Sequence, residues 1–200
     1  MNEAALAPRP VARDSTRLRF TMSEVLMLQE IGAFKGKRTQ LLDGEIHEMP
    51  TDGLPHIRYA MEIGARFIQA LKPGGFFIGV QTTLHLSPHN GPSPDVYVLS
   101  AGPLLKQTPP ERILLVVEVA DTSLDADLTD SASRYARHGV EEFWVVDVKN
   151  RRTHVHRHPR DGAYPAPDRV PFETPLSPAL IAGLQMRLAD FDAPSGADEN

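Results

Sequence analysis

At the centre of the sequence stands the run Ile113-Leu114-Leu115-Val116-Val117-Glu118-Val119. Its residues are apolar at odd and even positions alike, which predicts a central strand that is covered on both faces of its sheet. Glu118 is the exception. An ionised carboxylate among aliphatic side chains is costly unless it is paired or binds a metal ion.

Glu118 has two interpretations at this point. Side chains alternate along a strand, so Glu118 shares a face with Leu114 and Val116. In the first interpretation it is a ligand for a metal ion. In the second it lies at the end of the strand and forms an ion pair with an arginine such as Arg134. The run alone leaves both open.

On either side of this run the pattern alternates between strands and helices. Further strands are predicted at about 76–81, 83–87, 95–99, 143–148, 153–157 and, as a short edge strand, 169–172. Helices are predicted from Thr21 to about Ile31, over 55–71 and over 128–138. The first begins with a capping box of Thr21 and Glu24, and the last ends at Gly139, which suits the left-handed position after a helix.

Asp43-Gly44 joins two short segments, 40–42 and 45–49, and predicts a two-residue hairpin. The order of elements indicates an α/β fold, a mixed sheet flanked by helices. The length of 200 residues suits one domain. We place that domain at 18–192, with residues 1–17 as a flexible N-terminal arm and 193–200 as a flexible tail.

Composition excludes several classes of protein. The chain has no cysteine, which excludes disulfides, zinc–thiolate sites and cysteine nucleophiles. No signal peptide is visible, and no apolar run approaches the roughly 20 residues of a membrane span, so a cytoplasmic protein is expected. The formal net charge of −5 does not by itself indicate a nucleic-acid partner.

The densest basic group lies between residues 151 and 160 and is interpreted as the solvated rim of a hairpin. Within it, three histidines alternate along one strand, namely His154, His156 and His158. Such spacing can bind a transition metal, but a solvated edge is the preferred interpretation.

Asp95 provides a second carboxylate near the central strand. It precedes the segment 96–99, so it lies at the mouth of a strand. If the strands 95–99 and 112–119 pair antiparallel, as neighbours in sequence often do, Asp95 and Glu118 come within reach of one cation. Two carboxylates completed by water are what Mg²⁺ prefers. Such an ion would activate water and neutralise charge on a phosphate.

Several motifs follow one another in a fixed order between about residues 20 and 192. They are Gln40-Leu-Leu-Asp-Gly-Glu-Ile-His-Glu-Met49, His56, Gln81, Pro94-Asp95-Val96, Val117-Glu118-Val119 and Tyr135-Ala-Arg-His-Gly139-Val-Glu-Glu-Phe143-Trp144-Val-Val-Asp147. In this order and spacing the chain resembles the Uma family of putative restriction endonucleases, which belongs to the PD-(D/E)XK nuclease superfamily. The resemblance implies the restriction-endonuclease-like fold.

The resemblance also implies roles for individual residues. Asp95 and Glu118 would bind Mg²⁺ (or Mn²⁺), His56 would lie near the site at the start of its helix, and Gln81 would face it from the sheet. Two positions depart from the family pattern. The family's glutamate before the hairpin is Gln40 here, and its lysine on the helix after Glu118 is Ser131.

The missing lysine affects the expected chemistry, because in this superfamily that residue is thought to orient or deprotonate the attacking water. Arg134 lies one helical turn from Ser131 and could supply positive charge to the phosphate. Its high pKa makes it a poor general base. Four acids crowd the start of the same helix: Asp121, Asp125, Asp127 and Asp130. Capping and the helix dipole explain them, with Asp127 the one nearest to a metal role.

Three functions remain open. The first is a divalent-metal-dependent endonuclease that hydrolyses DNA, with a homodimer as its expected assembly. The second is a catalytically degenerate nuclease fold that binds nucleic acid or a protein partner without cutting, which Ser131, Gln40 and the negative charge favour. The third is a hydrolase of a different phosphodiester. No motif for a serine hydrolase or a phosphate-binding glycine loop is present.

Overall fold

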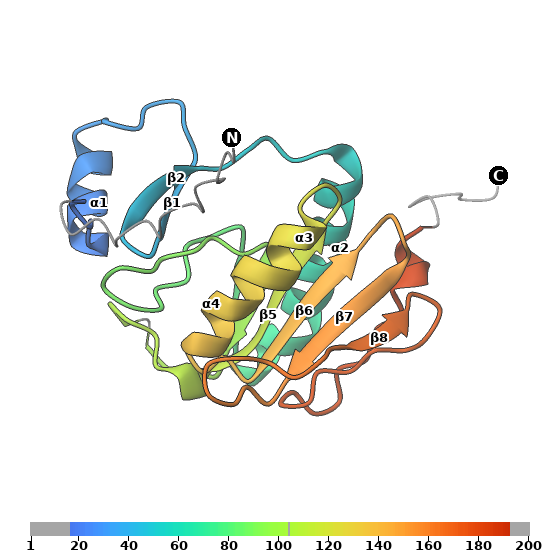
Figure 1. The fold of residues 1–200 in the computed structure, drawn as a ribbon. Helices are drawn as coiled ribbons and strands as arrows, with labels where there is room; N and C mark the ends of the chain where they lie inside the picture. The colour runs from blue at the N-terminus through green and yellow to red at the C-terminus, as the bar shows by residue number, and fades with distance from the viewer. Residues whose placement is uncertain (1–16, 104, 193–200) are drawn as a thin grey trace, which may run out of the picture.

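The computed structural model describes residues 17–103 and 105–192, which form a mixed α/β fold (Figure 1). Its main sheet has six strands in the order β3-β4-β5-β6-β7-β8. The strands are β3 (Phe77–Val80), β4 (Val96–Leu99), β5 (Ile113–Ala120), β6 (Glu142–Asp147), β7 (Arg152–Arg157) and β8 (Asp168–Pro171). Neighbours pair antiparallel except β5 and β6, which are parallel. The expected antiparallel pairing of β4 with β5 is confirmed.

Strand β5 is buried on both faces, as its apolar run predicts. Leu115 and Val117 belong to a core beneath helix α2 (Leu54–Leu71), together with the C-terminal segment. Val116 and Ala120 belong to a second core on the opposite face. The helices of that face are α3 (Leu124–Ala126), the π-helix η3 (Asp127–Ser131) and α4 (Ala132–Arg137). Figure 1 shows α4 in front of the sheet and α2 behind it.

Helix α2 presents one apolar face to the sheet. Pro55 suits its first turn, where a backbone N–H has no partner within the helix. Gly64 allows a close approach to β3, because a Cβ there would lie 2.9 Å from a methyl group of Val80. Ile68 lies at the border of this face and is 41% exposed.

A small N-terminal lobe stands beside the sheet (Figure 1). It contains α1 (Met22–Glu30), which begins with the expected capping box, and a hairpin of β1 (Thr39–Leu42) and β2 (Glu45–Glu48). The hairpin turns at Asp43 and Gly44, both with positive φ, as expected for this turn. Short 3₁₀ helices complete the fold: η1 (Lys72–Gly74), η2 (Pro110–Arg112) and η4 (Leu188–Phe191).

The strand expected over 83–87 is wrong, since this segment is a loop. Its backbone bonds to the returning chain, with Leu84 N–H donating to Pro92 and Leu86 N–H to Asn90. Prolines at 88, 92 and 94 lack the N–H that a longer ladder would need. The helix expected from 128 begins earlier, at Leu124, and it ends before Gly139 with the predicted positive φ.

The two ends of the chain lie almost entirely outside the described residues. The N-terminal arm and the C-terminal tail, expected at 1–17 and 193–200, lie outside the described residues except for Arg17, which pairs with Glu45 at 3.1 Å. Within 17–103 and 105–192, no helix combines the length and apolar character that a membrane crossing requires.

The interpretation of the alternating histidines as a solvated edge is wrong for two of them. His154 and His156 are 6% and 5% exposed, because β7 is an inner strand between β6 and β8 and its histidines face the side of α4. The ring of His156 stacks on Phe143 and also lies beside Tyr164. Both of its ring nitrogens are buried without a hydrogen-bond partner among the described residues.

This burial predicts acid sensitivity. Burial, followed by the charge of His154, lowers the pKa of His156 from its ordinary 6.5 to about 4. Between these values the unfolded chain binds more protons than the folded one, so stability falls as the pH drops from 6.5 towards 4, by roughly 3 kcal/mol at most. We expect His156→Phe to flatten this dependence in urea unfolding across the window. His47→Gln, on the exposed face of β2, should leave it unchanged; equal slopes for wild type and His156→Phe would refute the assignment.

Candidate active site

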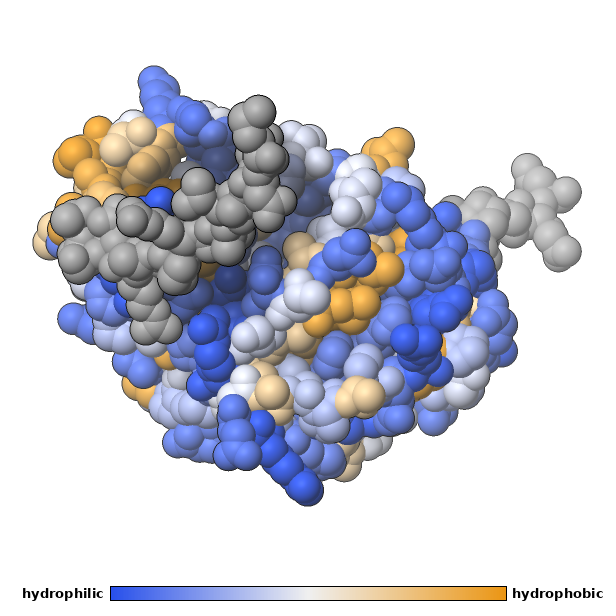
Figure 2. Space-filling view, viewed as in Figure 1, coloured by the Kyte–Doolittle hydropathy of each residue, from blue (hydrophilic) through white to orange (hydrophobic). Residues whose placement is uncertain are grey.

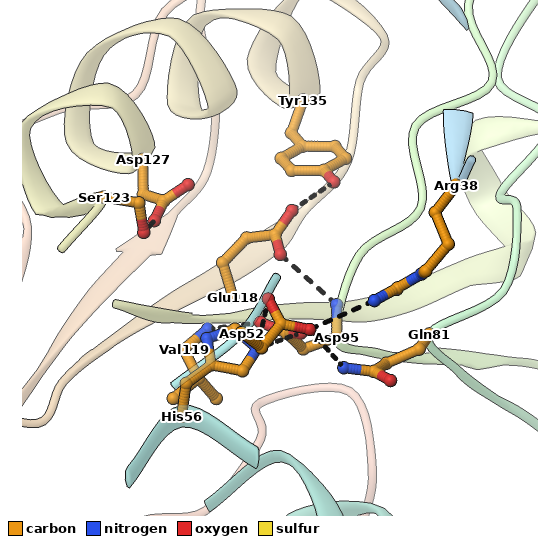
Figure 3. Close-up of polar contacts among 10 residues, drawn as sticks. All are labelled: Arg38, Asp52, His56, Gln81, Asp95, Glu118, Val119, Ser123, Asp127 and Tyr135. Atoms are coloured by element: carbon orange, nitrogen blue, oxygen red, sulfur yellow. Dashed lines mark hydrogen bonds and ion pairs between the residues drawn. The ribbon is translucent and has the colours of Figure 1, made fainter. Parts of the chain in front are cut away.

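Asp95 and Glu118 lie side by side where β4 begins and β5 ends. Val96 pairs with Val117, which brings the preceding Asp95 next to Glu118. The two carboxylates are bound reciprocally. Glu118 Oε2 accepts the backbone N–H of Asp95 at 3.2 Å, and Asp95 Oδ2 accepts the backbone N–H of Val119 at 2.8 Å (Figure 3). The antiparallel register therefore holds both carboxylates together, where β4 begins and β5 ends.

Two neighbouring side chains orient this pair. His56, in the first turn of α2, contacts Asp95 Oδ1 through Nε2 at 2.8 Å. Burial alone would lower the pKa of His56, but the hydrogen bond to Asp95 and the charges of Asp95 and Asp52 raise it overall. Tyr135, from α4, donates its hydroxyl to Glu118 Oε1 at 2.8 Å. Glu118 therefore bonds Tyr135, and its proposed ion pair with Arg134 is not formed.

Asp127 is a site residue that the sequence underrated. It lies in the π-helix η3 and lines the same pocket as Asp95 and Glu118. Ser123 and Ser131 donate to its two carboxylate oxygens, at 2.6 Å and 3.2 Å. Burial, and to a lesser degree the charge of Asp95, raises the pKa of Asp127. A π-turn of this kind is frequent at functional sites, and the sequence shows no signal for it.

Asp52 is a second residue that sequence reasoning missed. Its carboxylate joins three elements, with Arg38 at 3.1 Å, Gln81 at 3.3 Å and His56 at 3.6 Å (Figure 3). Gln81 therefore faces Asp52, and through it His56, from the end of β3. The one sequence signal is the spacing of Asp52 and His56, four residues apart at the start of a helix.

The remaining predicted residues line a pocket of about 660 Å³ above the two carboxylates. Gln40 Oε1 accepts the backbone N–H of Ser93 at 3.2 Å and so ties the hairpin to the loop before Asp95. Ser131 and Arg134 line the same pocket from η3 and α4. The Nε of Arg134 is buried and has no hydrogen-bond partner among the described residues.

Negative charge dominates the electrostatics of this pocket. Burial, followed by the charges of Asp95 and Asp127, raises the pKa of Glu118 well above its ordinary value. The hydrogen bond from Tyr135 lowers the pKa but does not compensate. Like charges that are desolvated together favour either a proton or a cation between them. The pocket thus has the electrostatic character of a cation site.

The donor set fits a hard divalent ion. Each carboxylate oxygen of Asp95 and Glu118 accepts one hydrogen bond and retains a lone pair. Among residues 17–103 and 105–192, no three His, Asp or Glu side chains are arranged to hold one ion together. Mg²⁺ typically keeps several waters and binds one or two protein carboxylates, so these residues are compatible with Mg²⁺ (or Mn²⁺).

Comparison with known proteins gives the family and the fold of the chain. No curated protein matches the chain. A crystal structure of a "putative nuclease belonging to DUF820" from Anabaena variabilis ATCC 29413 is similar in fold, with a TM-score of 0.67 and 16% identity over 86% of this chain and 97% of the other. The Uma2 family model, described as "Putative restriction endonuclease", matches residues 24–189. This chain therefore belongs to the Uma2 family and has its restriction-endonuclease-like fold.

Proposed function

We propose that this protein is a nuclease that hydrolyses DNA phosphodiester bonds with Mg²⁺ (or Mn²⁺) held by Asp95 and Glu118. The observation that supports this function is the reciprocal carboxylate pair on the floor of a polar pocket, with the pKa of Glu118 raised by burial and then by its negative neighbours. Membership in a family of putative restriction endonucleases supports the same reaction class.

In this proposal the side chains of the site have three roles, namely metal binding, orientation of the metal ligands and stabilisation of charge on the phosphate. Asp95 and Glu118 bind the ion, while His56 and Tyr135 fix the directions of their lone pairs. When bound, the ion would supply Lewis-acid chemistry, polarising the phosphate and lowering the pKa of a water molecule. Arg134 places a permanent positive charge on the pocket wall, where it can stabilise charge on the phosphate.

A second candidate is a nuclease fold that binds without cutting. Ser131 stands where the family has a lysine, and its hydroxyl already donates to Asp127. Gln40 stands where the family has a glutamate, and its carbonyl oxygen is engaged with Ser93. Both departures remove charged groups that would act on water. They favour a protein that keeps the metal site but hydrolyses slowly or not at all.

The test compares wild type with Asp95→Asn and with Asp125→Asn, an exposed acid outside the pocket lining. Each protein is incubated with supercoiled plasmid, single-stranded oligonucleotides and a small chromogenic phosphodiester, in Mn²⁺, Mg²⁺ or EDTA. The proposal expects metal-dependent cutting of DNA that Asp95→Asn abolishes and Asp125→Asn retains. Metal binding and DNA binding without cutting would instead identify the non-catalytic protein. Cutting of the small phosphodiester alone would indicate a different substrate.

A further inference from the structure

A row of paired residues crosses the sheet from the carboxylate site to a basic pocket. Glu118 on β5 pairs with Val145 on β6, Val145 with His154 on β7, and His154 with Arg169 on β8. Cross-strand partners point to the same face of a sheet. Arg169 therefore lies on the face of Glu118, three strand spacings or roughly 14 Å away.

The basic pocket at the end of this row has a volume of about 280 Å³. It is lined by Asn150, Arg151, Arg152, Arg169 and Pro171. Arg151 is neutralised by Glu173 and Asp192. Arg152 and Arg169, in contrast, form no ion pair within 17–103 and 105–192; Arg152 donates only to a backbone carbonyl, at 3.4 Å. Two guanidinium groups thus share one small pocket without a counter-ion from the described chain.

The pocket and the carboxylate site lie at the same end of the strands of this sheet. The site lies where β5 ends; Ala120 pairs with Asp147 at the end of β6, and Asp147 pairs with Arg152 at the start of β7. Between them, Lys149 in the β6–β7 turn contacts Asp121 after β5 at 3.7 Å. Figure 1 shows these strand ends along one side of the sheet. In Figure 2 strongly hydrophilic surface predominates in the region where β6, β7 and β8 meet this side.

We propose that Arg152 and Arg169 form a subsite for the phosphodiester backbone of nucleic acid, at the end of the strands where Asp95 and Glu118 also lie. This inference rests on the proposed nuclease function. Phosphate oxygens match the planar fork of a guanidinium group. A separation of roughly 14 Å is short enough for one nucleic-acid strand to reach both, because a strand advances about 3.4 Å per nucleotide along the duplex axis and also winds around that axis. The subsite would thus hold the backbone a few nucleotides from the bond that is cut.

This arrangement also reconciles the acidic chain with a polyanionic substrate. The carboxylate site repels phosphate when it holds no cation, so positive groups must attract the backbone elsewhere. Arg152 and Arg169 can do so because no described acid pairs with them. Each phosphate that they neutralise would release counter-ions, which makes the contact visible in the salt dependence of binding.

The experiment measures anisotropy of labelled duplex and single-stranded oligonucleotides in EDTA, which prevents cutting. Wild type, the double variant Arg152→Gln/Arg169→Gln and Arg160→Gln are compared between about 50 and 200 mM salt. Arg160 is exposed beyond the opposite end of β7 and serves as the matched control. We expect the double variant to bind at least about tenfold more weakly at low salt, with a salt slope smaller by about two, regardless of base sequence. Arg160→Gln should behave as wild type.

Other outcomes would overturn the subsite. An unchanged slope in a double variant that melts like wild type would do so, as would the absence of oligonucleotide binding by wild type at low salt. Binding of inorganic phosphate that the double variant loses, without any change in DNA affinity, would identify a site for small anions instead. The two proposals can fail separately. If the salt dependence of binding changes in the double variant but wild type does not cut DNA, the subsite stands and the nuclease function does not. If wild type cuts DNA but the salt dependence is unchanged, the nuclease function stands and the subsite does not.

Discussion

Replacing Glu118 with glutamine is expected to abolish Mn²⁺ binding and to raise the melting temperature of the metal-free protein. Removing a side chain that binds the ion directly lowers the affinity more than removing a residue that only supports such a ligand. The metal affinity should therefore fall by at least about 100-fold. Stability should rise because Glu118 is desolvated beside Asp95 and Asp127 and must either remain charged or take up a proton. Both cost free energy that a neutral amide does not.

The size of the stabilisation follows from the hydrogen bonds. Glutamine keeps an oxygen that accepts from Tyr135, but its NH₂ group cannot accept the longer bond from the backbone of Asp95. A net gain of about 1 kcal/mol corresponds to roughly 2–4 °C in a domain of this size. Titration calorimetry with Mn²⁺ and scanning calorimetry in EDTA measure the two effects.

The matched control is Glu111→Gln, which changes an exposed glutamate away from the pocket and should alter neither quantity. Retained metal heat in folded Glu118→Gln would place the ion elsewhere. A lower melting temperature in EDTA would show that Glu118 is compensated without metal, contrary to the electrostatics of the pocket.

Replacing Ser131 with lysine is expected to raise the rate of metal-dependent DNA cutting by about 10²-fold or more, the scale of general acid–base catalysis. Position 131 lines the pocket and lies within hydrogen-bond reach of Asp127. A lysine there would restore the family pattern and place an ammonium group beside Asp127. Unlike Arg134, a lysine can exchange a proton with water, provided that a bound cation offsets the carboxylates that would otherwise raise its pKa.

Ser133→Lys is the control for this gain. Ser133 is exposed two residues further along, in α4, and lines a different pocket that does not include Asp127. The Ser133→Lys substitution adds the same charge to the protein but places it outside the site. A gain for Ser131→Lys alone would show that the basic half of the site is missing in the natural chain. No gain, with Mn²⁺ binding intact and a wild type that cuts DNA, would show that another residue already performs this role; no cutting by either protein would identify the non-catalytic nuclease fold.

The sequence predicts the frame of the site because the frame depends on local pattern and neighbour pairing. The apolar run around Glu118 predicts a strand buried on both faces, and the direct succession of β4 and β5 in the chain favours their antiparallel pairing. These two facts are enough to bring Asp95 to Glu118. The departures at Gln40 and Ser131 are also visible in the sequence.

The rest depends on contacts between distant segments. Asp52 meets Gln81 across 29 residues, and no local pattern announces this contact. His154 and His156 alternate like an edge strand but become buried, because β8 extends the sheet beyond them and aromatic side chains such as Tyr164 cover their face. Asp127 resembles an ordinary acid at a helix start until the π-turn directs it towards the pocket.

The π-turn over Asp127–Ser131 also sets a constraint on how this protein can vary in length. A π-turn holds one more residue than an α-helical turn. Deleting a single residue there would restore a regular helix without rotating its two flanks, because the π-turn already accommodates that residue. Tyr135 would still pack in the core, but a deletion between Asp127 and Ser131 would change the spacing of the hydrogen bond that joins these two side chains. Homologous chains that differ by one residue in this connection would therefore share the fold while differing in the contacts of the acid at position 127.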